Sequence, residues 1–313
     1  MEYIINEQLN GKTIRDILRY DIGLSMAFVR LLKFSEQGIL LNGEHATVRK
    51  IVKTGDVLSL AIEDSNSSSQ LTPTDIPLDI VFENEKIIIP NKPPFMPTHP
   101  SILHHGDTLA DALAFRFQQK NQPFVFRPVN RLDRNTSGLT IIAKDRMTAS
   151  FLSAEMREGN IKKQYVAILC GELKSNEGII ETHLTRINDS IITRRVCGAD
   201  EGGDLAITHY KVLSTKNGYS LVIATPKTGR THQLRVHFTH IGHPIVGDDM
   251  YGTADLRIAR HALHAVKLSF PDPAKKDENI LVCAPLPKDM ADLASELFAD
   301  SIDEIYTNNF GLS

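Results

Sequence analysis

The chain has 313 residues, of which 42% are hydrophobic and 23% charged, with a formal net charge of −3. This length and composition suit a globular protein with a core of its own and exclude a disordered or fibrous chain. Residues 1–7 lack the features of a secretory signal, and no apolar run approaches the ~20 residues that cross a bilayer. Three scattered cysteines without paired spacing favour a reduced, cytoplasmic protein over a disulfide framework or a zinc site.

Residues 1–64 are predicted to form a small module of two short helices and a small sheet. Apolar residues recur at helical spacing in both predicted helices, at Ile14, Ile17 and Leu18 and then at Val29 and Leu32. Residues 38–43 predict a strand that ends in an Asn-Gly turn, a strong hairpin signal. Residues 52–58 predict a turn that leads into a last strand.

The next residues, 65–75, are rich in Ser, Thr and Pro and show no periodicity, which predicts a flexible linker. Residues 76–313 then form the larger domain. Its strands and helices do not alternate regularly, so we expect an α+β fold with a mixed, largely antiparallel central sheet flanked by helices. Strands are predicted at residues 205–212, 219–225 and 263–270. Helical apolar stripes are predicted at Leu109, Leu113 and Phe117 and at Phe151, Leu152 and Met156.

One segment, residues 129–138, places the carboxylate of Asp133 between Arg131 and Arg134 and then runs through Thr-Ser-Gly into an apolar strand. A carboxylate at the mouth of a strand, kept ionised by neighbouring cations, is suited to act as a base or nucleophile. Taken alone, the same residues also fit a surface loop whose charges pair with one another.

The order Arg-Leu-Asp-Arg-x-Thr-Ser-Gly-Leu resembles the catalytic motif of the RluA/RluD-type pseudouridine synthases, which isomerise uridine in RNA. Residues 163–171 and 226–237 resemble the second and third motifs of that family, and the likeness runs in order over roughly residues 76–300. Residues 1–64 resemble the small alpha-L RNA-binding domain named after a small-subunit ribosomal protein.

The resemblance implies an isomerase that needs no metal, nucleotide or redox cofactor. It implies Asp133 as the catalytic carboxylate, Arg235 as its ionic partner, and Tyr165 as the residue that stacks on the target base and whose hydroxyl assists proton removal. The chemical route that Asp133 takes stays open. The implied partner is RNA, with ribosomal RNA favoured over transfer RNA. We expect the protein to be a monomer that does not bind a membrane. The residues expected to contact RNA are Arg131, Arg134, Asn130 and Arg230, with Arg30 and Lys33 of the first module.

Two positions depart from the family pattern. Asn130 stands where the family commonly has histidine, and Asn135 where it often has aspartate. Asparagine keeps hydrogen-bonding capacity but cannot titrate near neutral pH. We therefore interpret Asn130 as a residue that contacts RNA or shapes the loop.

Two other classes of function stay open at this stage. The first is a catalytically silent RNA-binding or ribosome-assembly factor, which Asn130 favours. The second is a metal-dependent RNA hydrolase that uses the histidines of residues 232–243, although no His-Glu-x-x-His pattern is present. The net charge of −3 gives no general basic surface, so RNA binding requires a local basic groove offset by acidic surfaces, such as residues 272–278 and 289–304.

Overall fold

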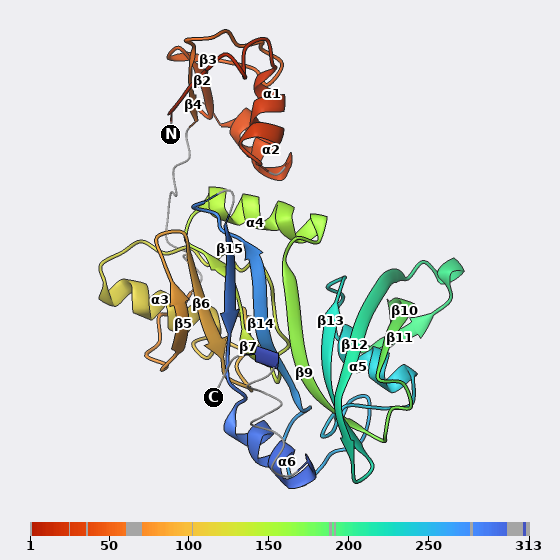
Figure 1. The fold of residues 1–313 in the computed structure, drawn as a ribbon. Coiled ribbons are helices and arrows are strands. Elements are labelled where there is room, and N and C mark those ends of the chain that lie inside the picture. The colour runs from red at the N-terminus through yellow and green to blue at the C-terminus, as the bar shows by residue number, and fades with distance from the viewer. Residues whose placement is uncertain are drawn as a thin grey trace.

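The computed structural model describes residues 2–24, 26–35, 37–60, 71–101, 103–187, 190, 192–275, 278–298 and 309–310. These residues form a small first module and a large domain built on one extended sheet (Figure 1). The α+β class predicted from the sequence is confirmed. Among the described residues, none of the helices combines the length and apolar character needed to span a membrane.

The first module is a four-stranded antiparallel sheet covered by short helices. Its strands, in spatial order, are β1 (Glu2–Ile4), β4 (Val57–Leu60), β2 (Ile39–Leu41) and β3 (Glu44–His45). Its helices are α1 (Ile14–Asp16), a π-helical segment η1 (Ile17–Asp21) and α2 (Met26–Phe34). The predicted helical residues Ile14, Ile17 and Leu18 are fully buried. Asn42 and Gly43 both have positive φ, as the predicted two-residue hairpin turn requires.

The predicted linker, residues 65–75, lies only partly in the described chain. Residues 65–70 lie outside the described residues, but Thr72 and Thr74 contact Asp111 in the first turn of α3 (Leu109–Gln119). The backbone N–H of Thr72 donates to the Asp111 carboxylate at 2.9 Å, and Leu71 packs against the apolar cluster beneath α3. A part-buried hydrogen bond and an apolar contact therefore hold residues 71–72 against the large domain.

The sheet of the large domain is mixed but almost wholly antiparallel. In the described residues its main path runs in the order β11-β10-β12-β13-β9-β14-β7-β6-β5, with β15 beside β14 and β8 beside β6. The pairing of β7 with β14 is parallel, and the other pairings are antiparallel. The strands predicted at residues 205–212, 219–225 and 263–270 are confirmed. The strand bounds are β5 (Asp79–Glu83), β6 (Ile87–Lys92), β7 (Ser137–Leu139), β8 (Ile142–Ala143), β9 (Lys162–Cys170), β10 (Glu177–Arg186), β11 (Arg194–Cys197), β12 (Asp204–Lys216), β13 (Tyr219–Pro226), β14 (Leu263–Pro271) and β15 (Asn279–Cys283).

Three further helices and a short 3₁₀ segment complete the domain. They are α4 (Arg146–Glu158), η2 (Ala199–Glu201), α5 (Gln233–His240) and α6 (Lys288–Phe298). Helix α5 contacts the lobe formed by β10 to β13, and α4 contacts β8 and β14. The predicted stripes on α3 and α4 pack into apolar clusters, as expected for core residues. Helix α4 lies beside the first module (Figure 1), where Met147 packs against that module's core.

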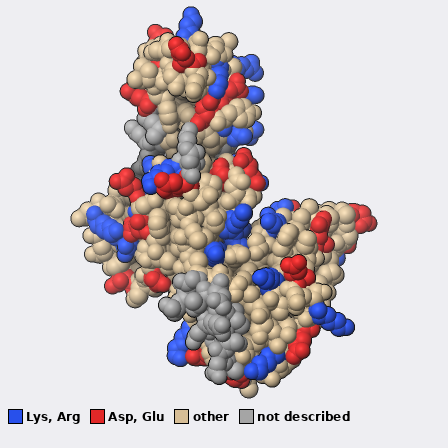
Figure 2. Space-filling model, viewed as in Figure 1, with Lys and Arg blue, Asp and Glu red and all other residues tan. Residues whose placement is uncertain are grey.

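Charged side chains are unevenly spread on the visible face. Figure 2 shows Lys and Arg gathered around the hollow between the body of the large domain and the lobe formed by β10 to β13. Acidic side chains are interspersed elsewhere. A net charge of −3 is therefore compatible with a local basic surface.

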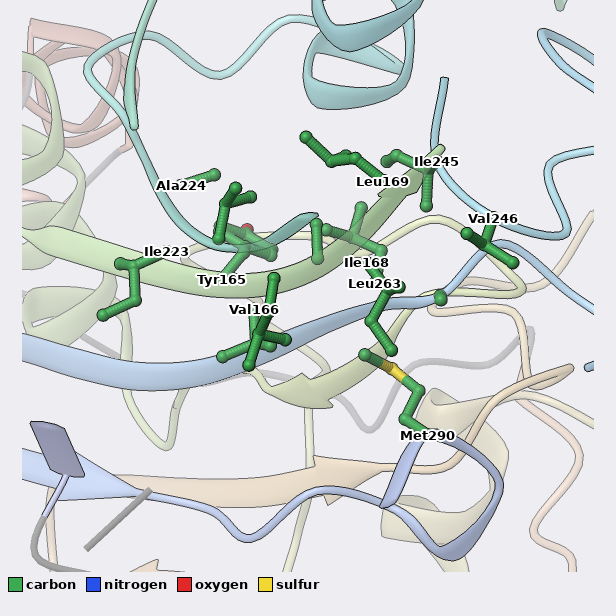
Figure 3. Packing of buried hydrophobic residues seen from close by; sticks show 14 of the residues in the cluster. Tyr165, Val166, Ile168, Leu169, Ile223, Ala224, Ile245, Val246, Leu263 and Met290 are labelled. Carbon is green, nitrogen blue, oxygen red and sulfur yellow. The ribbon is translucent and has the colours of Figure 1, made fainter. Parts of the chain in front are cut away.

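Strand β9 lies at the centre of the core and fixes the position of Tyr165. Val166, Ala167 and Ile168 are fully buried, so both faces of the strand are covered. Figure 3 shows side chains of β9 packed with those of β13, of residues 245–246 and of Leu263, with Met290 of α6 below. A tyrosine on so rigid a strand has little freedom to move, which suits a residue that must meet a ligand in one place.

Candidate active site

Asp133 lies on the loop that leads into β7, and the sequence around it explains the loop's shape. Gly138 has φ of +118°, and a Cβ there would lie 2.3 Å from the carbonyl oxygen of Ala265. Only glycine allows β7 to come this close to β14. The Thr-Ser-Gly run therefore places the Asp133 loop directly beside the end of β14.

The structure brings the three predicted catalytic residues together. Asp133, Tyr165 and Arg235 line one small inner pocket of about 90 Å³, to which Leu263 and His232 also contribute. The Asp133 carboxylate is 3.8 Å from the Arg235 guanidinium and 3.9 Å from the His232 ring. Its side chain is 29% exposed, so the carboxylate faces the pocket and remains open to a ligand.

Arg235 has a second and closer partner, Asp248, which sequence reasoning did not identify. Its Nε and Nη2 each donate to the Asp248 carboxylate at 2.7 Å, in a two-pronged pair that is almost wholly buried. Burial acts to raise the pKa of Asp248, but hydrogen bonding and charge from Arg235 lower it below its usual range. Arg235 is thus closer to Asp248 than to Asp133. The Asp248 carboxylate orients the Arg235 guanidinium towards the pocket.

His232 is the other residue near Asp133 that the sequence did not assign. It caps α5 with a left-handed backbone, and its Nδ1 lies 2.8 Å from the Tyr251 hydroxyl. Burial lowers the pKa of His232, against the opposing effect of Asp133, so the ring is neutral near pH 7. The signal available in the sequence was its place in the motif at residues 226–237, next to Arg235.

Tyr165 keeps its hydroxyl proton. Burial, with a smaller contribution from the charge of Asp133, raises the pKa of Tyr165 well above its ordinary value. The phenol can therefore accept a proton from a substrate only while it passes its own proton on. Its ring forms part of the apolar wall of the pocket.

An outer groove of about 790 Å³ leads to the inner pocket and is strongly basic. Among its described lining residues are seven Lys and Arg side chains and one carboxylate, that of Asp133. Phosphate groups bind where such cations cluster. The basic residues are Arg131, Arg134, Arg157, Lys162, Lys163, Lys227 and Arg230.

Three of these cations were predicted and four were not. Arg131 and Arg134 are exposed at the groove, and in the described part of the chain Asp133 pairs instead with Arg235, with the neutral ring of His232 beside it. The reading of residues 129–138 as a loop of mutually paired surface charges is therefore wrong. Arg230 is held by the Leu205 carbonyl at 3.0 Å. The four missed residues, Arg157, Lys162, Lys163 and Lys227, come from α4, β9 and the end of β13, and only the fold unites them.

Asn130 shapes the loop. Its side chain is buried, with its amide donating to the Leu139 carbonyl at 3.3 Å and its oxygen accepting from the Ile141 N–H at 2.8 Å. Both ends of the amide are thus engaged with the backbone that follows the Asp133 loop. The prediction of an RNA contact through this side chain is not supported, and Asn130 is not among the residues that we propose for RNA binding.

The two predicted RNA-binding residues of the first module lie apart from the pocket. Arg30 and Lys33 are exposed on α2, and the Lys33 ammonium lies 5.1 Å from the centre of the Phe34 ring. They therefore belong to a separate surface of the chain (Figure 1).

The histidines of residues 232–243 do not converge on one point. His232 contacts Tyr251, His237 contacts Thr182 on β10, and His243 contacts the Cys170 carbonyl at the end of β9. Within the described ranges no group of three or more His, Cys, Asp or Glu side chains could hold a metal ion.

A carboxylate where a basic groove meets a small inner pocket is suited to chemistry on a nucleic acid, and the comparisons identify the class of enzyme. The model of the RNA pseudouridylate synthase family matches residues 86–240. The uncharacterized RNA pseudouridine synthase YjbO of Bacillus subtilis is 36% identical over 87% of this chain and 95% of its own length. The ribosomal large subunit pseudouridine synthase D of Zymomonas mobilis is 33% identical over 83% of this chain and 86% of its own.

Solved structures give the same result. The human RNA pseudouridylate synthase domain containing 1 superposes with a TM-score of 0.56 at 30% identity, covering 67% of this chain and 84% of the human one. The chain therefore belongs to the RluA/RluD-type family of RNA pseudouridine synthases, and it is an isomerase that acts on RNA.

Proposed function

We propose that this chain converts specific uridines of large-subunit ribosomal RNA to pseudouridine, with Asp133 as the catalytic carboxylate. The observation that carries the proposal is the inner pocket, where Asp133, Tyr165 and Arg235 meet at the end of the basic groove. The choice of ribosomal over transfer RNA rests on relatives described as ribosomal large subunit pseudouridine synthases.

The isomerisation has a simple balance of bonds. The bond from the sugar to the base nitrogen breaks, the base turns, and the sugar bonds to a ring carbon, which loses its proton while the nitrogen gains one. In duplex or folded RNA the stacked neighbouring bases cover the reacting atoms of the uridine. The uridine must therefore leave its stack and enter the inner pocket. The walls of that pocket then hold the detached base while it turns.

Each pocket residue has a proposed task in this scheme. Asp133 acts directly on the sugar or base, with its negative charge stabilised by Arg235 at 3.8 Å. Tyr165 stacks on the base, and its protonated hydroxyl relays the ring-carbon proton. The reaction exchanges bonds within one nucleotide and changes no oxidation state, so it requires no cofactor.

The surrounding cations hold the RNA on either side of the flipped nucleotide. Arg131, Arg134 and Arg230 line the groove and contact the flanking phosphates. Arg30 and Lys33 give the first module a second, smaller contact with the same RNA. Because one chain supplies the whole inner pocket, we propose that the protein acts as a monomer, in the cytoplasm where its RNA is found.

The test is pseudouridine mapping of total RNA from source cells with and without the gene, rescued by wild type or Asp133→Asn. We expect specific sites to be lost on deletion and restored by wild type alone. If no site changes, the proposed substrate is wrong, and if Asp133→Asn restores every site, the proposed catalytic role of Asp133 is wrong. Sites lost in transfer RNA only would overturn the proposed substrate and leave the chemistry standing.

A further inference from the structure

In the loop that carries Asp133, each of four successive backbone carbonyls, from Leu132 to Asn135, accepts a hydrogen bond. The Leu132 carbonyl accepts from the Thr98 hydroxyl at 2.9 Å, and the Asp133 carbonyl from the Thr136 N–H at 3.1 Å. The next two carbonyls accept from buried cations: that of Arg134 from the ammonium of Lys92 at 3.1 Å, and that of Asn135 from the guanidinium of Arg260 at 3.2 Å.

Lys92, on β6, is fully buried and donates to three backbone carbonyls. These belong to Pro93 at 2.9 Å, Met96 at 2.8 Å and Arg134 at 3.1 Å. Three acceptors match the three N–H bonds of an ammonium group, whereas a neutral amine has only two to give. Burial and the charge of Arg260 lower the pKa of Lys92 to about 7, while Asp133 raises it. The bond to the Arg134 carbonyl places the Lys92 ammonium one residue along the loop from Asp133.

Arg260, in the segment before β14, reaches the same loop. Its side chain is fully buried, and its Nε and Nη2 donate to Asp289 at the start of α6, at 2.7 and 3.0 Å. Its remaining Nη1 donates to the carbonyls of Asn135, His261 and Leu263. This arginine ties the Asp133 loop to the start of β14 and to α6 at once.

We propose that Lys92 and Arg260 are positioning residues, a two-cation clamp that fixes the Asp133 carboxylate in its reactive place. The inference rests on the proposed function of Asp133, and it names the residues that hold Asp133 in position. Buried charges are costly, and apolar residues of similar volume often serve stability equally well. Two buried cations on consecutive carbonyls next to one carboxylate in the chain are instead suited to placing that group within a fraction of an ångström.

The clamp predicts a loss of chemistry without a loss of RNA binding, because neither cation lines the groove or the inner pocket. The variants are Lys92→Met and Arg260→Lys, with Thr98→Val as a nearly isosteric variant that removes a single hydrogen bond. Matched controls are Lys144→Met, a half-buried lysine paired with Glu83, and Arg257→Lys, an arginine three residues from Arg260 paired with Asp255. None of the control contacts touches the Asp133 loop.

The assay is release of tritium from large-subunit ribosomal RNA transcribed with 5-³H-uridine, under single turnover with saturating protein. We expect Lys92→Met and Arg260→Lys to slow this step by about tenfold or more, since small misplacements of a reacting group are costly. RNA dissociation constants should stay within about threefold, and the controls should match wild type. Rates equal to the controls, or rates reduced only in line with RNA affinity or the folded fraction, would overturn the clamp.

A second measurement needs no activity and separates this inference from the proposed function. Amide hydrogen exchange of residues 133–138 should be faster in both clamp variants, and also in Thr98→Val, than in wild type or the controls. Exchange elsewhere in the sheet should be unchanged. Unchanged exchange in the loop would refute the clamp even if the enzyme is active. Faster exchange would support it even if another RNA is the substrate.

Discussion

The pair between Arg235 and Asp248 offers a sharp test of the site, through the variant Asp248→Asn. Both side chains are nearly wholly buried, at 6% and 1% exposed, and two 2.7 Å hydrogen bonds join them. Removing one partner of such a pair leaves an uncompensated buried charge, which costs about 3–5 kcal/mol. Asparagine keeps one oxygen as an acceptor, so we expect the lower end, about 3 kcal/mol. In a domain of this size that lowers the melting temperature by ~6–12 °C.

The same variant should also disturb the chemistry. Without Asp248, the nearest remaining carboxylate for the Arg235 guanidinium is Asp133, now 3.8 Å away. Arg235 is then drawn towards Asp133, which shields the carboxylate from its substrate. We expect the single-turnover rate to fall by more than the folded fraction alone explains.

The assay is denaturant unfolding at pH 7 and again at lower pH, with Asp292→Asn as the control. Asp292 forms an exposed pair with Lys288 on α6, worth about 0–1 kcal/mol. Because the pKa of Asp248 is lowered in the folded state, its contribution is complete above the unfolded value of about 4 and is lost as the pH falls through the folded value. The gap between wild type and Asp248→Asn should therefore close in acid. A cost at pH 7 no larger than that of the control, or a gap that persists in acid, would refute the reasoning.

Three more outcomes follow from the contacts of the site. Tyr165→Phe should keep RNA affinity but slow single turnover by more than about tenfold, since the ring remains and the proton relay is lost; a wild-type rate would leave stacking as its whole role. Replacing Lys162 and Lys227 with Gln should weaken RNA binding. The slope of log affinity against log salt should become shallower by about 1.4, as for two single-strand phosphate contacts. An unchanged slope would mean that these two lysines do not contact RNA phosphates. Asn130→Ala should destabilise the fold by about 1–3 kcal/mol in urea unfolding, because the buried Ile141 N–H loses its acceptor; a loss of RNA affinity with full stability would return Asn130 to the RNA surface.

Much of the fold follows from local patterns in the sequence. The periods of two and 3.6 residues identify the long strands β12, β13 and β14 and the stripes of α3 and α4, because each buries one or both faces against a neighbour. The Asn42-Gly43 turn follows from the positive φ that both residues must adopt. The contact of residues 71–72 with α3 does not follow from such a pattern, because a polar, Pro-containing segment carries no sign that Asp111 will bind its backbone.

For the candidate site, too, the sequence predicts some residues and not others. Asp133, Tyr165 and Arg235 are recognisable because each lies in a motif with a specific order of residues. Their supporting contacts join distant parts of the chain, as with Arg260 and Asn135, which lie 125 residues apart. No periodicity or spacing encodes such a pair, since it depends on how strands β7 and β14 meet. The basic groove is likewise invisible in the total charge, because its cations come from separate elements.

The asparagine at position 130 illustrates why chemistry cannot be assigned from residue type alone. In a family that commonly has histidine there, the loss of a titratable group is what a silent relative would show. Here, however, the residue does not line the inner pocket, its side chain is buried, and both ends of its amide bind the backbone after the Asp133 loop. A group in that place acts by holding the loop, which asparagine does with one donor and one acceptor and without titrating. The substitution is therefore compatible with an intact reaction, and the behaviour of Asp133→Asn, rather than the identity of residue 130, decides whether Asp133 carries that reaction.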